Sequence, residues 1–232
     1  MKLLSVCLLY YNKPDALAKH ITLWHSYHRE CQTNIRFVII DDGSRPCLAS
    51  DDLKTQGLDI EIYRIHKDIP WNIGGARNLA AHVAKTKWIL IQDSDVFLQP
   101  DAVPSVLSVC KRDFFGRTVY KFGRVNPSTG RDSPHPGTMM LKKSLYWKIG
   151  GCDEDFVGHY GFTDVHFFKQ RVARRITTKV KTLSNLKLIE DDDGATTNLD
   201  RSNIRNEKLY KSKSKHQKWS TDYLRFKWSR VY

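Results

Sequence analysis

Long hydrophobic runs are missing from this sequence of 232 residues. No apolar stretch approaches the roughly 20 residues that cross a bilayer. The first nine residues look like the start of a signal peptide, but they run into Tyr10-Tyr11-Asn12-Lys13-Pro14 without a small-residue cleavage site. We therefore expect a buried first strand here, in a cytoplasmic protein for which peripheral contact with a membrane stays open.

Cysteine pairs in the spacing of a metal site are also missing. The five cysteines are scattered and odd in number, and no Cys-x-x-Cys occurs. This pattern argues against both a zinc site and a disulfide framework. A reducing compartment is the expected environment.

Acidic residues are absent from one stretch, so the net charge of +13 is unevenly spread. Residues 165–189 hold seven basic residues and no acidic one, residues 190–200 hold five carboxylates, and residues 201–232 hold ten basic and two acidic residues. The positive charge belongs mainly to the C-terminal third. Such a segment favours an anionic partner: a phosphate-bearing substrate, a membrane surface or a nucleic acid.

Short apolar runs alternate with helical patterns along the first hundred residues. The runs that predict strands are 3–10, 35–40, 60–65 and 88–92, and those that predict helices are 14–28, with Asn12 as its cap, and a segment from about residue 75. This alternation predicts an α/β fold with a mostly parallel central sheet flanked by helices. The second half is less regular, with strands expected at 118–123, 138–141 and 186–190 and a helix at 162–173.

Carboxylates follow two of the predicted strands directly. Asp41-Asp42 ends one apolar run and Asp93-Ser94-Asp95 ends another. Ligands of open parallel sheets bind beyond the carboxyl ends of the strands, so both clusters are expected to face one cleft. Paired carboxylates at that place suit Mg²⁺ or Mn²⁺, which can neutralise a diphosphate leaving group. The alternative is a turn with solvated carboxylates.

A glycine pair opens the helix that begins near residue 75. Gly74-Gly75 could let backbone amides approach a phosphate, and Arg77 in the first turn could add a planar cation. The alternative is a glycine-rich loop needed for its turn alone. The Gly-x-Gly-x-x-Gly spacing is absent, which argues against nicotinamide binding.

A third constellation is rich in glycine and carboxylates. It comprises residues 150–156 followed by Thr163-Asp164 at the start of a predicted helix. A carboxylate beside an acceptor hydroxyl is what a general base requires, and a helix start favours its ionised state. Alternatively, Asp164 is an N-terminal cap.

Taken in order, these segments resemble the glycosyltransferases of family 2 with the GT-A fold, over about residues 3–190. The resemblance implies a donor-binding half over 1–100 and an acceptor-side half over 101–200, followed by a basic aromatic extension over 201–232. Tyr10, Asp42, Gly75, Arg77 and Asp93 are implied donor contacts, with Asp42 at the base and Arg77 near the diphosphate. Asp93 and Asp95 are the implied ligands of Mn²⁺ or Mg²⁺, Asp164 the implied base, and the transfer inverting. The matching segments are Leu9-Tyr10-Tyr11-Asn12-Lys13, Val38-Ile39-Ile40-Asp41-Asp42-Gly43-Ser44, Gly75-Ala76-Arg77-Asn78, Asp93-Ser94-Asp95, and Gly150-Gly151-Cys152-Asp153-Glu154 with Thr163-Asp164.

The sequence departs from the family pattern at three places. Thr163 stands where the first carboxylate of an acidic pair is usual, and Leu9 where many relatives have a small hydroxyl residue. Many relatives also supply a histidine ligand after the last core strand, whereas this chain has residues 190–193, all acidic. Asp192 is therefore an expected third metal ligand, with a solvated acidic turn as the alternative.

Several functions stay open. A nucleotide-sugar donor, most simply a UDP-sugar, and a glycan or glycolipid acceptor are favoured, with His135 and His159 as candidate substrate contacts. The basic extension also allows a hydroxylated base in DNA or an anionic membrane as partner. A non-catalytic binding module is a further alternative, and the extension could instead pack across the domain. Nucleotidyltransfer is disfavoured because residues 8–13 contain no glycine.

Overall fold

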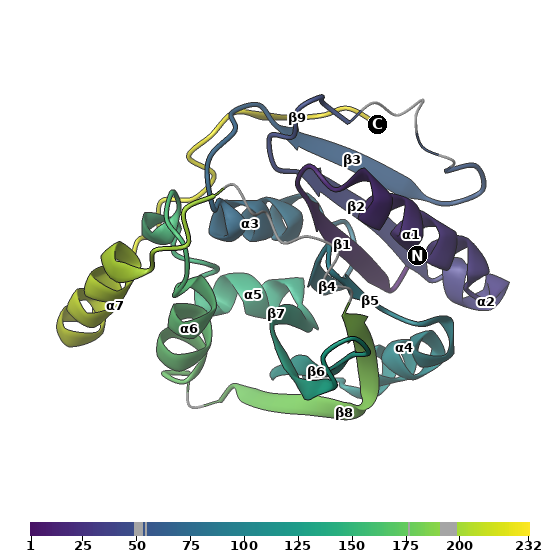
Figure 1. Ribbon diagram of the computed structural model, residues 1–232. Coiled ribbons are helices and arrows are strands. Elements are labelled where there is room, and N and C mark those ends of the chain that lie inside the picture. The colour runs from purple at the N-terminus through teal and green to yellow at the C-terminus, as the bar shows by residue number, and fades with distance from the viewer. Residues whose placement is uncertain (49–52, 54, 176, 191–198) are drawn as a thin grey trace.

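The computed structural model describes residues 1–48, 53, 55–175, 177–190 and 199–232, in which helices flank one central sheet (Figure 1). The strands are β1 (Leu4–Tyr10), β2 (Ile35–Asp41), β3 (Ile60–Ile65), β4 (Trp88–Asp93), β5 (Val96–Phe97), β6 (Thr118–Asn126), β7 (Arg131–Lys142), β8 (Lys179–Glu190) and β9 (Trp228–Arg230). The helices are α1 (Pro14–Ser26), α2 (Arg29–Gln32), α3 (Ile73–Val83), α4 (Val103–Arg112), α5 (Lys143–Ile149), α6 (Thr163–His166) and α7 (Ile204–His216). Short turns of other helix types are η2 (Pro100–Ala102), η3 (Glu154–Phe156) and the π-helical η4 (Phe167–Val172).

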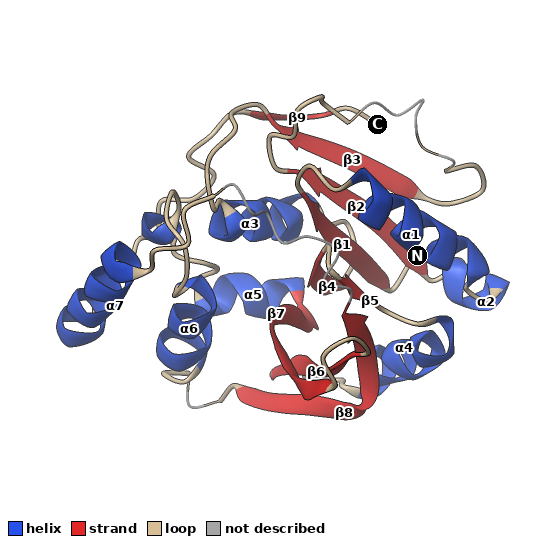
Figure 2. Ribbon diagram, in the orientation of Figure 1, coloured by secondary structure: helices blue, strands red, loops and turns tan. Residues whose placement is uncertain are grey.

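The sheet has the strand order β5-β8-β6-β7-β4-β1-β2-β3-β9. Its centre, β4-β1-β2-β3, is parallel, whereas β7 and β9 join the two sides of this centre in antiparallel pairings (Figure 2). Every residue of β1 is buried, as expected of a parallel strand covered on both faces. The predicted α/β architecture is therefore confirmed.

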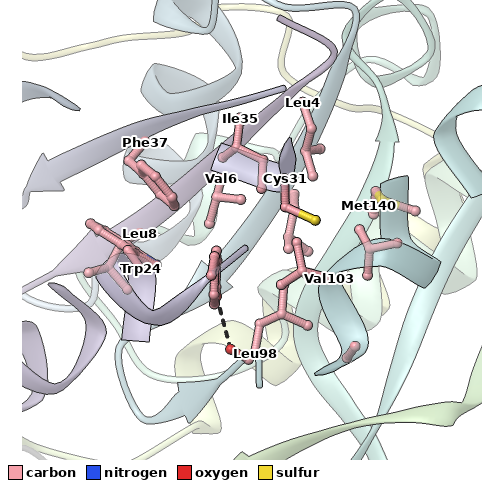
Figure 3. Packing of buried hydrophobic residues seen from close by; sticks show 14 of the residues in the cluster. Leu4, Val6, Leu8, Trp24, Cys31, Ile35, Phe37, Leu98, Val103 and Met140 are labelled. Atoms are coloured by element: carbon pink, nitrogen blue, oxygen red, sulfur yellow. Dashed lines mark hydrogen bonds between the residues drawn. The ribbon is translucent and has the colours of Figure 1, made fainter. Parts of the chain in front are cut away.

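Two hydrophobic clusters cover the two faces of the sheet. One lies beneath α1, α2 and α4 and is drawn in Figure 3, where Trp24 lies beside Phe37. These two rings stack with their centroids 4.4 Å apart. The other cluster lies beneath α3 and α5. The sheet is thus held between two helical layers, which leaves the ends of its strands open to ligands.

The described part of residues 201–232 packs on this domain. Strand β9 pairs with β3, with Tyr63 opposite Arg230. Leu224, Phe226 and Trp228 pack against the second cluster. The division between 1–200 and 201–232 stays a prediction, but its second part contributes a strand to the sheet of the first.

Some local predictions are corrected by tertiary contacts. Asn12 does not cap α1: Lys13 holds the cap position, and Asn12 Oδ1 instead accepts the backbone NH of Arg45 at 2.8 Å. The helix expected at 162–173 begins at Thr163 and continues as a π-helix from Phe167. Within the described parts of the chain, each helix is too short or too polar to cross a membrane.

Candidate active site

A cleft of about 220 Å³ opens where β1, β2 and β4 end. Three carboxylates and two cations reach it from different elements. Its position is the one predicted for ligands of an open parallel sheet. The lining residues are Leu9, Tyr10, Tyr11, Lys13, Asp42, Ile69, Trp71, Asn72, Ile73, Ala76, Asp93, Ser94, Asp95, Leu199 and Arg201.

The two aspartates at the end of β2 have different surroundings. Asp41 is buried, pairs with Arg64 at 2.6 Å and accepts the backbone NH of Ser44 at 2.9 Å. Asp42 lines the cleft, where Asn72 Nδ2 donates to its Oδ1 at 2.7 Å. Burial raises the pKa of Asp42 to about 7, the bond from Asn72 opposes that rise, and neighbouring carboxylates add to it. Asp42 therefore faces the cleft, whereas Asp41 holds the loop that follows the strand.

Asp93 and Asp95 flank Ser94 in the turn after β4. One ligand atom of each lies within 4.8 Å of the other and of a ring nitrogen of His135. Oδ1 of Asp95 is buried and has no hydrogen-bond partner in the described structure. Burial, followed by the charge of Asp93, raises the pKa of Asp95. A divalent cation would satisfy this buried oxygen, so the residues fit Mn²⁺ or Mg²⁺.

His135 reaches this turn from β7. Strand β7 runs antiparallel to β4, with Met139 opposite Ile91, so residues four positions earlier in β7 extend past the end of β4. Nδ1 of His135 accepts the backbone NH groups of Gly137 and Thr138 at 3.2 and 3.0 Å. The neutral ring therefore carries its proton on Nε2 and can donate a hydrogen bond there. The local sequence gives no signal for this placement, because it depends on which strand pairs with β4.

A second histidine supports the same turn from behind. His20, on α1, is buried and lies 3.1 Å from the carbonyl oxygen of Ser94 through Nε2. Gln92 Nε2 lies 3.4 Å from His20 Nδ1 and donates to the carbonyl of Val96 at 2.8 Å. Burial lowers the pKa of His20 to about 4, although the Ser94 carbonyl opposes this. Neutral His20, stacked on Phe97, fixes the backbone between the two cleft aspartates.

Arg77 is buried between two functional carboxylates. Its Nη1 donates to Asp164 Oδ1, and its Nη2 lies 3.3 Å from Asp93 Oδ1. Burial lowers its pKa, but Asp164 and Asp93 raise it by more, so the net shift is upward. Arg77 lies in the second turn of α3, not the first, and does not line the cleft that the described residues form. The structure thus places Arg77 behind the site, where it joins its two sides.

The glycine pair of α3 is buried by close packing. A Cβ added at Gly75 would lie 2.2 Å from Asn72 Oδ1 and 2.5 Å from Phe226 Cε1. One added at Gly74 would lie 3.6 Å from Cys152 Cβ. Glycine is therefore required at position 75 because Asn72 and Phe226 of the C-terminal segment lie so close to it. Gly75 does not border the cleft that the described residues form.

Asp164 completes the ion-pair chain at the start of α6. Its side chain is 31% exposed, whereas that of Arg77 is 1% exposed. Phe162 holds the cap position of α6 without a side-chain bond, so the interpretation of Asp164 as a cap is wrong. Gly137 makes room for this arrangement, because a Cβ there would lie 2.4 Å from both Arg77 Nη2 and Asp93 Oδ2. Asp164 is therefore oriented from its buried side and accessible from the other.

The carboxylates of residues 153–155 serve the C-terminal segment. Lys213 Nζ lies 2.9 Å from Asp153 Oδ2 and 2.7 Å from Asp155 Oδ2. Glu154, which is buried, accepts the backbone NH of Leu224 at 2.8 Å. These contacts occupy three carboxylates that the sequence places close to Asp164, and they hold α7 and the segment after it against the domain.

The last acidic run of the sequence is only partly described. Glu190 is buried, pairs with Arg124 and accepts Asn126 Nδ2 at 3.2 Å, which explains it without a metal. Asp192, the expected third metal ligand, lies outside the described residues.

Solved structures of other proteins share this architecture at low sequence identity. S. aureus TarS 1-349 has a TM-score of 0.61 at 16% identity, over 83% of this chain and 61% of that one. TarS 1-349 in complex with UDP-GlcNAc gives 0.60 at 15%, over 84% and 60%. Mannosyltransferase PcManGT from Pyrobaculum calidifontis, in complex with GDP-Man and Mn2+, gives 0.61 at 12%, over 90% and 61%. This chain thus spans about three fifths of the length of each, and the likeness shows the fold.

Among curated proteins, none matches the sequence significantly. The sequence profile of Glycosyl transferase family 2 matches residues 5–176, which include the cleft aspartates, Arg77 and Asp164. With that match, the chain belongs to glycosyl transferase family 2, and the shared architecture shows that it has the GT-A fold.

Proposed function

We propose that this protein transfers a sugar from a nucleotide-diphosphate donor to an acceptor hydroxyl in a metal-dependent, inverting reaction. Asp42 and Tyr10 contact the donor base, Asp93 and Asp95 hold Mn²⁺ or Mg²⁺, and Asp164 is the general base. The bound ion would neutralise the diphosphate leaving group. Two of the similar structures are complexes with UDP-GlcNAc and with GDP-Man, which supports a nucleotide-sugar donor; we favour a UDP-sugar.

The observation that carries this proposal is the chain Asp93–Arg77–Asp164. One buried guanidinium contacts both a carboxylate that lines the cleft and the carboxylate of α6. The buried side chain of Arg77 thereby fixes the distance between Asp93 on the donor side and Asp164 on the acceptor side, as preorganised catalysis requires. In place of the direct donor contact expected from the sequence, we assign Arg77 the role of positioning Asp164.

In the proposed step, the acceptor oxygen attacks the anomeric carbon while its proton passes to Asp164. The bond between that carbon and the donor diphosphate breaks as the new glycosidic bond forms. Attack from the side opposite the leaving group inverts the anomeric centre. Asp164 needs access to the acceptor, and its partly exposed side chain supports this.

A glycan or glycolipid acceptor is favoured over DNA or an anionic membrane. Several cations of the C-terminal segment are already engaged: Lys213 and Arg225 pair with Asp155, and Arg230 lies 3.3 Å from Glu61. Fewer cations of this segment are therefore available to bind a polyanion than the number of its basic residues suggests. A hydroxylated DNA base stays a second candidate acceptor, and a non-catalytic module is disfavoured by the arrangement around Asp164.

A donor screen tests the proposal. Purified protein is mixed with UDP- and GDP-sugars in the presence of Mn²⁺, and thermal shift and sugar release are measured with and without EDTA. We expect one nucleotide class to stabilise the protein and to be hydrolysed slowly only when the metal is present. The winning donor is then offered to glycans, glycolipids and hydroxymethylated DNA, and the product anomer is read by NMR. Binding and turnover that are unaffected by EDTA would reject the metal role, and retention of configuration would reject inversion.

A further inference from the structure

Beyond the residues assigned so far, the described cleft has two cations at its rim, Lys13 and Arg201. Arg201 belongs to the basic extension, which lies beyond the residues that the family profile matches. Its side chain is exposed, and it pairs with no carboxylate among the residues that the structure describes. With a divalent cation bound, the three carboxylates (−3), Lys13 and Arg201 (+2) and the ion (+2) would leave the described cleft with a net charge of about +1, which favours an anionic ligand.

The backbone around Arg201 is fastened to the cleft wall. Trp71, which lines the cleft, donates from its indole Nε1 to the carbonyl oxygen of Asp200 at 2.7 Å. Asp200 Oδ1 in turn accepts the backbone NH of Ser202 at 2.8 Å. Trp71 adopts a positive φ of 51°, which is uncommon for a bulky residue and is found where function requires it. The segment before α7 is therefore held at the cleft by a specific side chain.

Two aromatic rings that pack on each other lie to one side of the guanidinium. Its carbon lies 6.0 Å from the ring centroids of Trp71 and Tyr160, and these rings meet edge to face at 4.7 Å. The loop that carries Tyr160 is itself anchored, because buried Asn206 of α7 donates to the carbonyls of His159 and Gly161 at 2.8 and 2.9 Å. Contact with these two rings restricts the side-chain rotamers of the exposed Arg201, while its N–H groups stay free to donate hydrogen bonds.

We infer that Arg201 binds the diphosphate of the nucleotide-sugar donor. This deepens the proposed function and rests on it. The planar guanidinium suits bidentate bonding to phosphate oxygens, and it comes from the part of the chain beyond the acidic run, so that the extension takes part in the donor site. Trp71 acts as a positioning residue through its hydrogen bond to the Asp200 carbonyl and through its ring contact with Arg201.

The test compares ligands that differ in their phosphates. Calorimetry in the presence of Mn²⁺ measures the binding of UDP and GDP, and saturation-transfer NMR measures the binding of uridine and guanosine. Both measurements are made on wild type, Arg201→Gln, Arg201→Lys and Trp71→Phe. We expect Arg201→Gln to weaken binding of the preferred diphosphate about 10- to 100-fold, the value of a lost charge-assisted hydrogen bond, and to leave the nucleoside unaffected. Arg201→Lys should recover part of the loss. Trp71→Phe, which keeps the ring but removes the indole NH, should cause a smaller loss in the same direction.

Arg112→Ala, which removes an exposed arginine at the end of α4, is the matched control and should bind both ligands as wild type does. Unchanged diphosphate affinity in Arg201→Gln would overturn the inference, and so would an equal loss for diphosphate and nucleoside, which would place Arg201 at the base. If wild type binds neither diphosphate, the proposed function itself fails. The two failures are thus distinguishable in one set of titrations.

Discussion

Two acidic runs of this protein have opposite surroundings. In residues 93–95, Asp95 keeps a buried oxygen without a hydrogen-bond partner in the described structure, and both aspartates line the cleft. In residues 153–155, the three carboxylates meet Lys213, Arg225 and backbone NH groups of the C-terminal segment. A similar composition thus lies open to a ligand in the first case and serves tertiary structure in the second. What separates them is Asp95: Asp93 meets Arg77, but one buried oxygen of Asp95 has no protein partner in the described structure, whereas protein groups occupy all three carboxylates of the second run.

The largest effect is expected in the first run. Asp95→Asn removes a charge but little volume, so we expect transfer to fall by about 10³-fold, because metal ions contribute several kcal/mol to such reactions. Mn²⁺-dependent binding of a nucleoside diphosphate should be lost in calorimetry. Asp101→Asn, an exposed carboxylate outside the cleft, serves as the control. If Asp95→Asn binds the nucleoside diphosphate with wild-type affinity, residues 93–95 do not differ from residues 153–155 in ligand binding.

A comparable loss is expected when the proposed general base, Asp164, is removed. Asp164→Asn should keep donor affinity and reduce transfer by about 10²- to 10⁴-fold. Single-turnover kinetics with saturating donor measure the chemical step directly. Normal turnover in this variant would assign the base elsewhere, and the occupied carboxylates of residues 153–155 would then need to be reconsidered.

The second run should respond in stability. Glu154→Gln places an amide NH₂ where Glu154 accepts the backbone NH groups of Leu224 and Arg225. We expect the free energy of unfolding to fall by about 1–3 kcal/mol, measured by urea denaturation. Asp132→Asn, in an exposed pair with Lys187, should change it by less than about 0.5 kcal/mol. A Glu154→Gln variant of normal stability that cannot turn over would contradict a structural role.

The smallest effect concerns Asp42 and depends on pH. Its folded-state pKa of about 7 exceeds the value of about 3.9 in an unfolded chain, so the stability that Asp42 contributes is full below about pH 4, is lost as the pH rises to about 7, and changes no further above that. Asp42→Asn should therefore stabilise the protein by about 1 kcal/mol at pH 8 and by almost nothing at pH 4. Urea denaturation at the two pH values, without donor, measures the difference. An equal change in the free energy of unfolding at pH 4 and at pH 8 would show that the effect does not come from ionisation of Asp42.

The parallel centre of the fold can be predicted from the sequence, because each of its strands is a separate apolar run between turn residues. Ile60–Ile65, for example, is delimited by its own residues. Strand β9 cannot be predicted in this way. Its three residues, Trp228–Arg230, are half-buried or exposed, and they form a strand because β3 offers an edge.

The candidate site divides along the same line. Asp42, Asp93 and Asp95 follow strands directly, so the rule for parallel sheets is sufficient to place them at the cleft. His135, Arg201 and the occupied state of Glu154 depend on pairings between distant segments. Arg77 is recognisable as important from its own segment, but its burial follows from Gly137 on another strand, which no local pattern reveals.

Strand β9 has a consequence for self-association. It takes up the outer hydrogen-bonding edge of β3, where Ile62 and His66 would otherwise offer backbone groups to any extended chain. Because this pairing joins distant parts of the sequence, it is expected late in folding, and until it forms the edge is open to a second molecule. Once paired, the C-terminal segment protects the folded protein against edge-to-edge association, a role that needs neither its charge nor any substrate.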